Sequence, residues 1–302
     1  GPGLHYQPAV KAADGVYEIS NAGQLFWFAK ETTGTGGSAL NARLTKDIII
    51  PNGRVFSPIG GSQGGNSYSG TFDGQGYSIT GMTISNSMNI YTGFVGKLSQ
   101  GGIIRNVHFK DVSVNATVSD VGAICSTNYG TIENCSVESG NVSGLLSVGG
   151  ICGANNGTIL LCTNMADVSA SMNSAGGICG KNTGTVENCL NTGNAGAQWY
   201  IGGICGENAS GAMVHSCLNL GAVTATLPGY ESTAGGLVGA RFALPVNSYY
   251  AAAAEGFDGA RTREQLLSGE VTWLLNEEQA TGVWGQMLDG ASMPELEGKA
   301  VY

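Results

Sequence analysis

The sequence has few charged residues and no cluster of positive ones. Only 12% of its 302 residues are charged, and 13 Lys and Arg against 22 Asp and Glu give a net charge of −9. Because phosphate backbones and anionic lipids attract basic runs, we expect neither nucleic acid nor a membrane surface as a partner. No stretch approaches the roughly 20 apolar residues that cross a bilayer, so we expect no membrane insertion.

Proline and histidine are also scarce, with seven and three residues, whereas glycine is abundant, with 50. The glycines follow no Gly-X-Y period, which excludes collagen. Hydrophobic residues make up 42% of the chain in short runs, which disfavours disorder, and the wealth of Gly, Asn, Ser and Thr is typical of short strands and tight turns. The chain opens without a signal peptide, on Gly1-Pro2, which resembles the remnant of a protease cleavage. We therefore expect the full-length protein to contain further domains.

A cysteine-bearing phrase recurs along the middle of the chain. Residues 149–153 and 176–180 both read GGICG, and related phrases precede and follow them. Alignment on this phrase reveals a repeat of about 27 residues with two cysteine columns. The first column holds Cys125, Cys152, Cys179 and Cys205, and the second holds Cys135, Cys162, Cys189 and Cys217.

The residues around the cysteines indicate how each repeat folds. Apolar residues alternate with their neighbours between glycines, which is typical of a strand with one buried face. These residues are Ile132, Ile159, Val186 and Val214. Asparagine, which tolerates left-handed backbone and can bond to a copy above or below, recurs in turns. Its columns are Asn128, Asn155, Asn182 and Asn208, and Asn164, Asn191 and Asn219. We predict an all-β fold, a right-handed parallel β-helix with two or three short strands in each coil.

Valine replaces cysteine where the phrase is degraded. Val95 and Val107 stand in the two columns upstream, and Val238 stands in the first column downstream, within GGLVG at 235–239. A position that accepts valine requires a small apolar side chain and not a thiolate. The cysteines are therefore predicted to be structural.

Both flanks of the repeat predict a cover for the open ends of the stack. Ser20 or Asn21, with Gln24, is the expected start of one helix, and Thr262 with Gln265 is the expected start of another. We therefore divide the chain into a leader (1–16), an N-terminal cap (17–43), the β-helix (44–250) and a C-terminal cap with a short helix (251–302).

Several of these phrases resemble the GLUG-motif repeats of bacterial surface proteins. The likeness rests on GGLVG at 235–239, its GGICG variants and TIENC at 131–135, and it extends over residues 17–302. It implies a secreted or cell-wall-associated protein, as in adhesin-like proteins and the non-catalytic parts of some immunoglobulin A proteases. It supplies no catalytic residues. The density of cysteine departs from the general pattern of the family.

The cysteines do not have the spacing of a metal site. Metal sites use Cys-x2-4-Cys pairs or Cys with His, whereas nine or more residues separate these cysteines. In-register Cβ atoms within a column would lie about 4.8 Å apart, beyond the usual ~3.5–4.5 Å of a disulfide. Pairing across columns, such as Cys125 with Cys135, stays open in an extracellular protein. We favour free, buried thiols that act as small hydrophobes, and we expect no metal and no other cofactor.

Two outward carboxylates are the pattern that points toward a polysaccharide-acting enzyme. Glu133 and Glu187 share one column two coils apart, about 9.6 Å, which is near the upper limit for an inverting pair. Leu160 lies between them and no further acids flank them, which favours a solvated face. His108 alternates with apolar neighbours and is expected to face solvent.

Aromatic residues in the loops between coils are the remaining candidates for a binding site. Trp199 and Tyr200 lie in one such loop, and Tyr230 lies in the next. Exposed rings can stack on the face of a sugar or anchor a protein partner. The alternative is a small cluster of rings that packs on itself.

The sequence thus favours a non-catalytic extracellular β-helical module of a bacterial surface protein, for adhesion, ligand binding or rigid display. Its expected partner is a host glycan or protein. Two alternatives stay open: a polysaccharide-acting β-helix enzyme, and an accessory region of a secreted protease.

Overall fold

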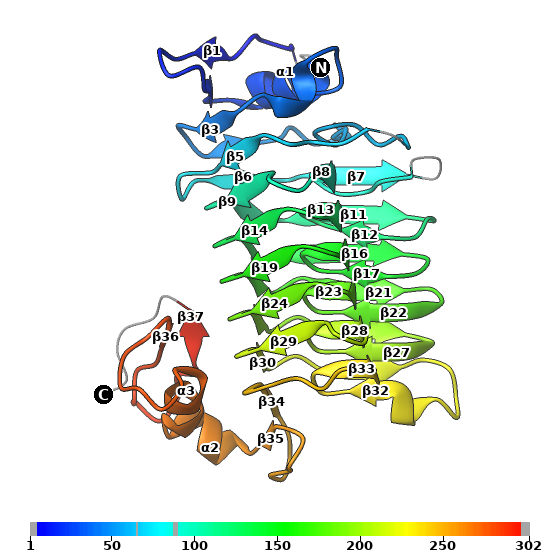
Figure 1. Ribbon diagram of the computed structural model, residues 1–302, viewed down its shortest axis with the longest axis vertical. Helices are drawn as coiled ribbons and strands as arrows, with labels where there is room; N and C mark the ends of the chain where they lie inside the picture. Colours follow the sequence, from blue (N-terminus) through cyan, green and yellow to red (C-terminus); the bar gives the residue numbers. More distant parts are fainter. Residues whose placement is uncertain (1–4, 65, 87–89, 297–302) are drawn as a thin grey trace.

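The chain winds into a stack of parallel coils in the computed structural model, which describes residues 5–64, 66–86 and 90–296 (Figure 1). The predicted all-β parallel helix is confirmed. Five sheets run along the stack, and each complete coil passes through all five in turn. We number them sheets 1 to 5 in the order in which the chain visits them.

Sheets 1 and 2 each contain nine strands. Sheet 1 consists of β1 (Val10–Lys11), β2 (Tyr17–Ile19), β3 (Ala42–Leu44), β5 (Thr71–Asp73), β9 (Ile103–Arg105), β14 (Thr131–Glu133), β19 (Thr158–Leu160), β24 (Thr185–Glu187) and β29 (Met213–His215). Sheet 2 consists of β4 (Ile48–Ile49), β6 (Ser78–Thr80), β10 (His108–Lys110), β15 (Ser136–Val137), β20 (Thr163–Asn164), β25 (Leu190–Asn191), β30 (Leu218–Asn219), β34 (Tyr249–Ala251) and β35 (Ala260–Arg261). Apart from the antiparallel pair of β1 and β2, the strands of both sheets pair in parallel.

Sheets 3, 4 and 5 contain six, five and six strands. Sheet 3 consists of β7 (Thr83–Asn86), β11 (Val112–Ala116), β16 (Gly140–Gly144), β21 (Asp167–Ala170), β26 (Ala195–Ala197) and β31 (Val223–Ala225). Sheet 4 consists of β12 (Val121–Gly122), β17 (Val148–Gly149), β22 (Asn173–Gly176), β27 (Trp199–Gly202) and β32 (Ala234–Gly235). Sheet 5 consists of β8 (Val95–Leu98), β13 (Cys125–Asn128), β18 (Cys152–Asn155), β23 (Cys179–Asn182), β28 (Cys205–Asn208) and β33 (Val238–Arg241).

The coil has more corners than the sequence predicted, with five short strands in place of two or three. One corner follows strands β9, β14, β19, β24 and β29 of sheet 1, where a residue adopts a left-handed backbone with φ between 50° and 56°. The residues at this corner are Asn106, Asn134, Leu161, Asn188 and Ser216. Such a conformation ends the strand and turns the chain into sheet 2. The residues of the predicted Asn columns do not adopt this conformation, and their side chains are buried.

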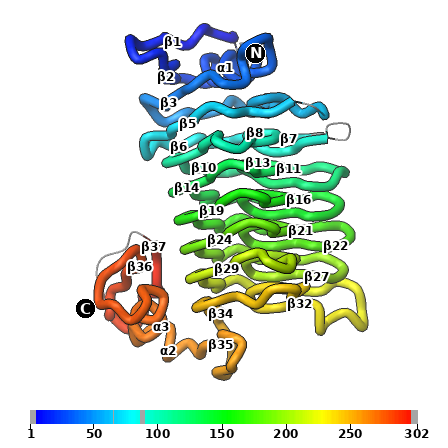
Figure 2. The backbone as a smooth tube through the Cα atoms, in the orientation of Figure 1, coloured from blue at the N-terminus to red at the C-terminus, as the bar shows by residue number. Residues whose placement is uncertain are grey.

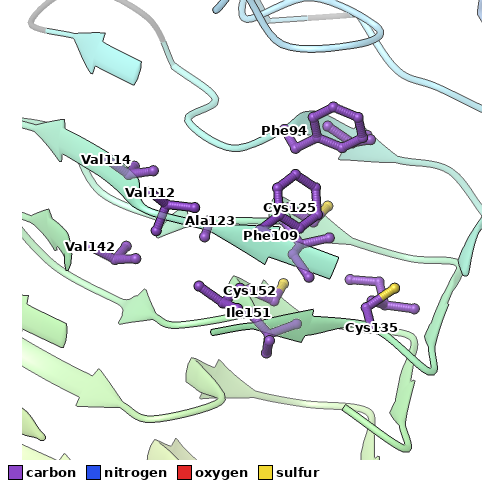
Figure 3. Packing of buried hydrophobic residues seen from close by; sticks show 14 of the residues in the cluster. Phe94, Phe109, Val112, Val114, Ala123, Cys125, Cys135, Val142, Ile151 and Cys152 are labelled. Atoms are coloured by element: carbon purple, nitrogen blue, oxygen red, sulfur yellow. The ribbon is translucent and has the colours of Figure 1, made fainter. Parts of the chain in front are cut away.

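The interior changes in character along the stack. Near the N-terminus it is filled by aromatic rings, including Phe94, whose ring centroid lies 5.3 Å from that of Phe56 and 4.9 Å from that of Phe109. Figure 3 shows Phe94 above Phe109 and Cys125, with Cys152 below them. Large rings thus fill the first coils, while Ile, Val and Cys suffice in the regular coils that follow.

A helix, α1 (Ala22–Glu31), covers the N-terminal end of the stack, preceding the short 3-10 helix η1 (Gly37–Ala39). Of the two predicted N-caps, Asn21 is the one used, because its side chain accepts a hydrogen bond from the Gln24 N–H at 2.9 Å. The helix buries Leu25, Phe26 and Phe28 against the first coils.

The C-terminal unit lies beside the stack (Figure 2). It consists of α2 (Arg263–Leu267), α3 (Glu270–Leu275), β36 (Trp284–Gly285) and β37 (Glu295–Leu296). Thr262 and Gln265 form the expected capping box, but Gly269 at φ 89° divides the expected single helix into two. Leu266 and Trp284 pack on Leu190 and Leu218 of sheet 2. The C-terminal unit therefore packs against the outer face of sheet 2 and not over the end of the stack.

The parallel ladder is longer at both ends than the predicted span of 44–250. It begins at β2, which pairs with β3, and ends at β35, which pairs with β34. Among the helices in the described ranges, none is long and apolar enough to span a membrane.

Candidate functional site

The structure brings two of the three predicted aromatic residues together at a corner of the solenoid. Trp199 begins β27, and Tyr230 immediately precedes a second 3-10 helix, η2 (Glu231–Thr233), in the longer loop between β31 and β32. Their ring centroids lie 5.7 Å apart with an interplanar angle of 37°. Tyr230 is 44% exposed and Trp199 is partly exposed. Together the two rings form an apolar platform that a ligand can reach.

Tyr200 has a different role in the same corner. Its backbone is left-handed, with φ 57°, and its N–H donates to the Thr233 hydroxyl at 3.1 Å. This bond joins β27 to the loop that carries Tyr230. Within the described part of the chain, the Tyr200 ring does not form a stacked or edge-on pair with either of the other two rings. We therefore define the aromatic corner as Trp199 and Tyr230, with Tyr200 as a backbone anchor.

A groove of about 400 Å³, with both apolar and polar lining residues, runs over sheet 3 near this corner. Its lining includes Asn115, Ser143 and Ser169, which stand in one outward column of three neighbouring coils. The Ser143 hydroxyl donates to the Asn115 side-chain oxygen at 3.0 Å. Gln198, next to Trp199, reaches back to the Ser171 carbonyl at 3.0 Å. The groove thus offers hydroxyl and amide groups, and the Gln198 bond to Ser171 links it to the strand that carries Trp199.

All eight cysteines are buried free thiols in the structure. Cys125 pairs in register with Val95, and Cys205 pairs in register with Val238, so valines continue the first column at both of its ends. The Cys179 and Cys205 sulfurs lie 3.4 Å apart. Burial raises the pKa of the Cys152 and Cys179 thiols, which keeps them neutral and apolar in character.

The two asparagine columns form hydrogen-bonded ladders inside the stack. In the first, the Asn155 amide donates to the Asn182 side-chain oxygen at 2.9 Å, and Asn182 donates to Asn208 at 2.9 Å. Asn128 continues this ladder, donating to Asn155 at 2.8 Å. A second ladder joins Asn164, Asn191 and Asn219. Except for Asn208, which donates to the Ala243 carbonyl, each amide also donates to a backbone carbonyl two residues further along the chain, so the ladders satisfy polar groups at buried corners.

The carboxylates of the enzyme hypothesis lie in a column of mixed charge on sheet 1. Glu133 opposes Arg105 in register, and Glu187 opposes His215, with a His Nδ1 to Glu Oε1 distance of 3.5 Å. Leu160 separates the two glutamates, as the sequence indicated. Glu187 thus has a basic partner, whereas Arg105 forms its ion pair with Asp73, at an Nε to Oδ2 distance of 3.1 Å. Within the described residues, no three His, Cys, Asp or Glu side chains gather in a group that could hold a metal ion.

The sequence predicted that His108 faces solvent, but in the structure it is partly buried and contacts a neighbouring coil. Its Nδ1 lies 2.6 Å from the Ser136 hydroxyl of the next coil, and it lines a cleft of about 460 Å³ between sheet 2 and the C-terminal unit. The other wall includes Met293 and Leu296. Sequence reasoning missed this cleft because it placed the C-terminal segment over the end of the stack. The sequence did contain one indication of it. In one column of sheet 2, Ser136 and Thr163 are followed by Leu190 and Leu218, and these leucines need a cover.

Comparison with known proteins finds likeness over part of the sequence and over the whole fold. No known family matches the chain, so membership of the GLUG-repeat proteins remains a prediction. A "Putative Gly-rich membrane protein" of Evansella cellulosilytica is 33% identical over 111 residues, which is 34% of this chain and 13% of that protein. "Halomucin" of Haloquadratum walsbyi is 36% identical over 118 residues, 35% of this chain and 1% of that protein. The matches thus span small parts of both relatives.

Among solved structures, the chain is similar to a crystal structure described as "a putative immunoglobulin A1 protease from Bacteroides ovatus". The TM-score is 0.67, and the match covers 98% of this chain and 96% of that one. Because the sequence identity is 21%, this likeness shows the fold alone.

Proposed function

We propose that this chain is a non-catalytic, extracellular β-helical module that binds a glycan at the aromatic corner. The observation that carries the proposal is the exposed pair of Trp199 and Tyr230, 5.7 Å apart, on a scaffold of paired strands. Aromatic faces stack on the apolar faces of sugar rings and lose little conformational entropy when they do so.

The surroundings of the corner support a glycan over a purely apolar partner. The sheet 3 groove supplies hydroxyl and amide groups in a row, including Ser143 and Ser169. A carbohydrate needs such donors and acceptors for its hydroxyls when its apolar face is stacked on a ring. Rows of equivalent groups repeated from coil to coil would suit a ligand that is itself a polymer.

The names of the relatives support an extracellular setting. One relative is described as a Gly-rich membrane protein and the other as a halomucin, and this chain matches only 13% and 1% of their lengths. A repeat module within a larger surface protein would have this distribution. The membership of the GLUG-repeat family that the sequence suggests belongs to the same proposal.

Binding to a glycan array tests the proposal directly. Trp199→Ala should reduce binding to the recognised glycans at least tenfold, because covering a large apolar side chain with ligand contributes about 1.5–3 kcal/mol. Trp273, in α3, is 42% exposed and lies in the C-terminal unit, so Trp273→Ala is the matched control. Equal binding by wild type and Trp199→Ala, or an equal loss in both variants, would overturn the aromatic corner as the site.

A further inference from the structure

A second pocket lies at the C-terminal end of the stack, on the side where no helix covers it. Its volume is about 530 Å³. The pocket is lined by Leu237 and Val238 of the last full coil and by residues of the segments 241–250 and 257–261. It is separate from the aromatic corner, whose two rings are not among its lining residues.

Positive charge is concentrated in this pocket. Arg241 and Arg261 both line it, although the chain has only 13 basic residues and a net charge of −9. The acidic side chain in the lining is Asp258, which accepts a hydrogen bond from the Tyr250 hydroxyl at 2.7 Å. An anionic group would therefore meet two guanidinium groups in a protein that is acidic as a whole.

The arginines are held in place but retain free donors. Arg241 donates through Nε to the Val238 carbonyl at 3.1 Å. Arg261 stacks over the Tyr249 ring, 4.6 Å from its centroid, and donates through Nη1 to the Ala260 carbonyl at 2.9 Å. Its Nε is buried and has no hydrogen-bond partner in the described residues.

The rest of the lining is apolar and partly open to solvent. Leu244 is 71% exposed and Phe257 is fully exposed, and both stand at the pocket with the Tyr249 and Tyr250 rings. Apolar side chains this exposed are unusual beside a preformed pocket unless something covers them. They would contact the body of a ligand whose charged group reaches the arginines.

We propose that this pocket binds a carboxylate that carries an apolar or aromatic body. The carboxylate is placed between Arg241 and Arg261, where guanidinium groups match its two oxygens, and the body lies against Leu244 and Phe257. The proposal does not depend on glycan binding at the aromatic corner, since the two sites share no residue.

Calorimetric titration with 3-phenylpropionate, at low ionic strength, tests the proposal. The neutral analogue 3-phenylpropionamide has the same shape and should bind at least tenfold more weakly, because it cannot form charge-assisted bonds to the arginines. Arg241→Gln should weaken binding of the carboxylate by about 10- to 100-fold. Arg263→Gln, an exposed arginine outside the lining, should leave binding unchanged.

A second variant protects the test against a folding defect. Leu244→Asp changes an exposed side chain, so the protein should fold, and it adds a negative charge at the rim that should abolish carboxylate binding. Equal affinity for the acid and the amide, no saturable binding by wild type, or unchanged binding in both Arg241→Gln and Leu244→Asp would overturn the proposal.

Discussion

The two ends of the stack differ in how their apolar side chains and strand edges are covered. At the N-terminal end, α1 lies over the first coils and buries Leu25 and Phe28 completely. At the C-terminal end, the helices lie against sheet 2, and Phe242, Leu244 and Phe257 stay exposed. Strands β31, β32 and β33 are the last of their sheets, so they have free edges there. The N-terminal end is covered and buried, whereas the C-terminal end leaves apolar side chains and strand edges accessible.

Arg241 lessens the hazard of the open end. Free strand edges invite pairing with other chains, and charged side chains at the edge oppose it. By donating to the Val238 carbonyl, Arg241 covers one acceptor of β33 and places a charge beside it. The same residue thus protects the edge and forms part of the proposed pocket.

The largest expected difference between the ends is in stability. Phe28→Ala should lower the free energy of unfolding by about 3–5 kcal/mol, because it opens a cavity between α1 and the rings of Tyr68 and Phe72. Phe257→Ala, at the other end, should change it by no more than about 0.5 kcal/mol, because that ring is solvated. Urea unfolding measures both, and losses of equal size would contradict the comparison.

We expect loss of the Trp284 side chain to detach the C-terminal unit from sheet 2 without unfolding the coils. Trp284 is 1% exposed and its indole N–H donates to the Asn188 side chain at 3.0 Å, which ties the unit to the stack. Trp284→Ala should cost the unit about 3 kcal/mol and admit proteases to residues 262–296, while the coils resist digestion. The exposed Trp273→Ala should not change the digestion pattern. Loss of the whole β-helix in Trp284→Ala would show instead that this unit is a true end cap.

A smaller change in stability is expected for substitutions in the first cysteine column, in the middle of the stack. Since Val95 and Val238 occupy the column at its two limits, Cys179→Val should cost less than about 1.5 kcal/mol. Cys179→Ser should cost more, because it places a hydroxyl among apolar neighbours. Thermal unfolding ranks the two variants. A serine variant more stable than the valine variant would mean that the thiols act as polar donors.

The smallest expected effect is a titration at the open end. Burial, assisted by the bond to Asp258, raises the pKa of Tyr250 to about 12. Because the folded value lies above the unfolded one of about 10, the contribution of Tyr250 to stability is complete below pH 10 and is lost as the pH rises toward 12. Phenolate absorbance should show a late step that Tyr250→Phe removes. Titration of Tyr250 together with the exposed tyrosines would contradict this environment.

The sequence was sufficient to predict the β-helix because each coil repeats the same inward side chains. Alignment of Cys152 with Cys179, and of both with Val238, identifies in-register positions before any coordinates are known. The number of strands in a coil was less accessible. Its corners depend on left-handed backbone at residues as different as Asn134, Leu161 and Ser216, which share a conformation but not a side chain.

The candidate sites were predicted only in part, because they join residues from different coils. Trp199 and Tyr230 could be proposed from adjacent loops, but the separate role of Tyr200 depends on a backbone bond to Thr233. The pocket of Arg241 and Arg261 could not be predicted, since it exists only where the C-terminal helices leave the end open. No local pattern distinguishes a helix that covers an end from one that packs on a side.

Hydrogen exchange measured peptide by peptide tests the unequal ends most directly. We expect amides in the central strands β18 and β19 to exchange most slowly, and those of β3 and β5, beneath α1, to be protected nearly as well. Amides of β31 to β33 should exchange much faster, because their outer edges are unpaired. Equal protection at both ends, or faster exchange in α1 than in β33, would contradict the account of one closed end and one open end.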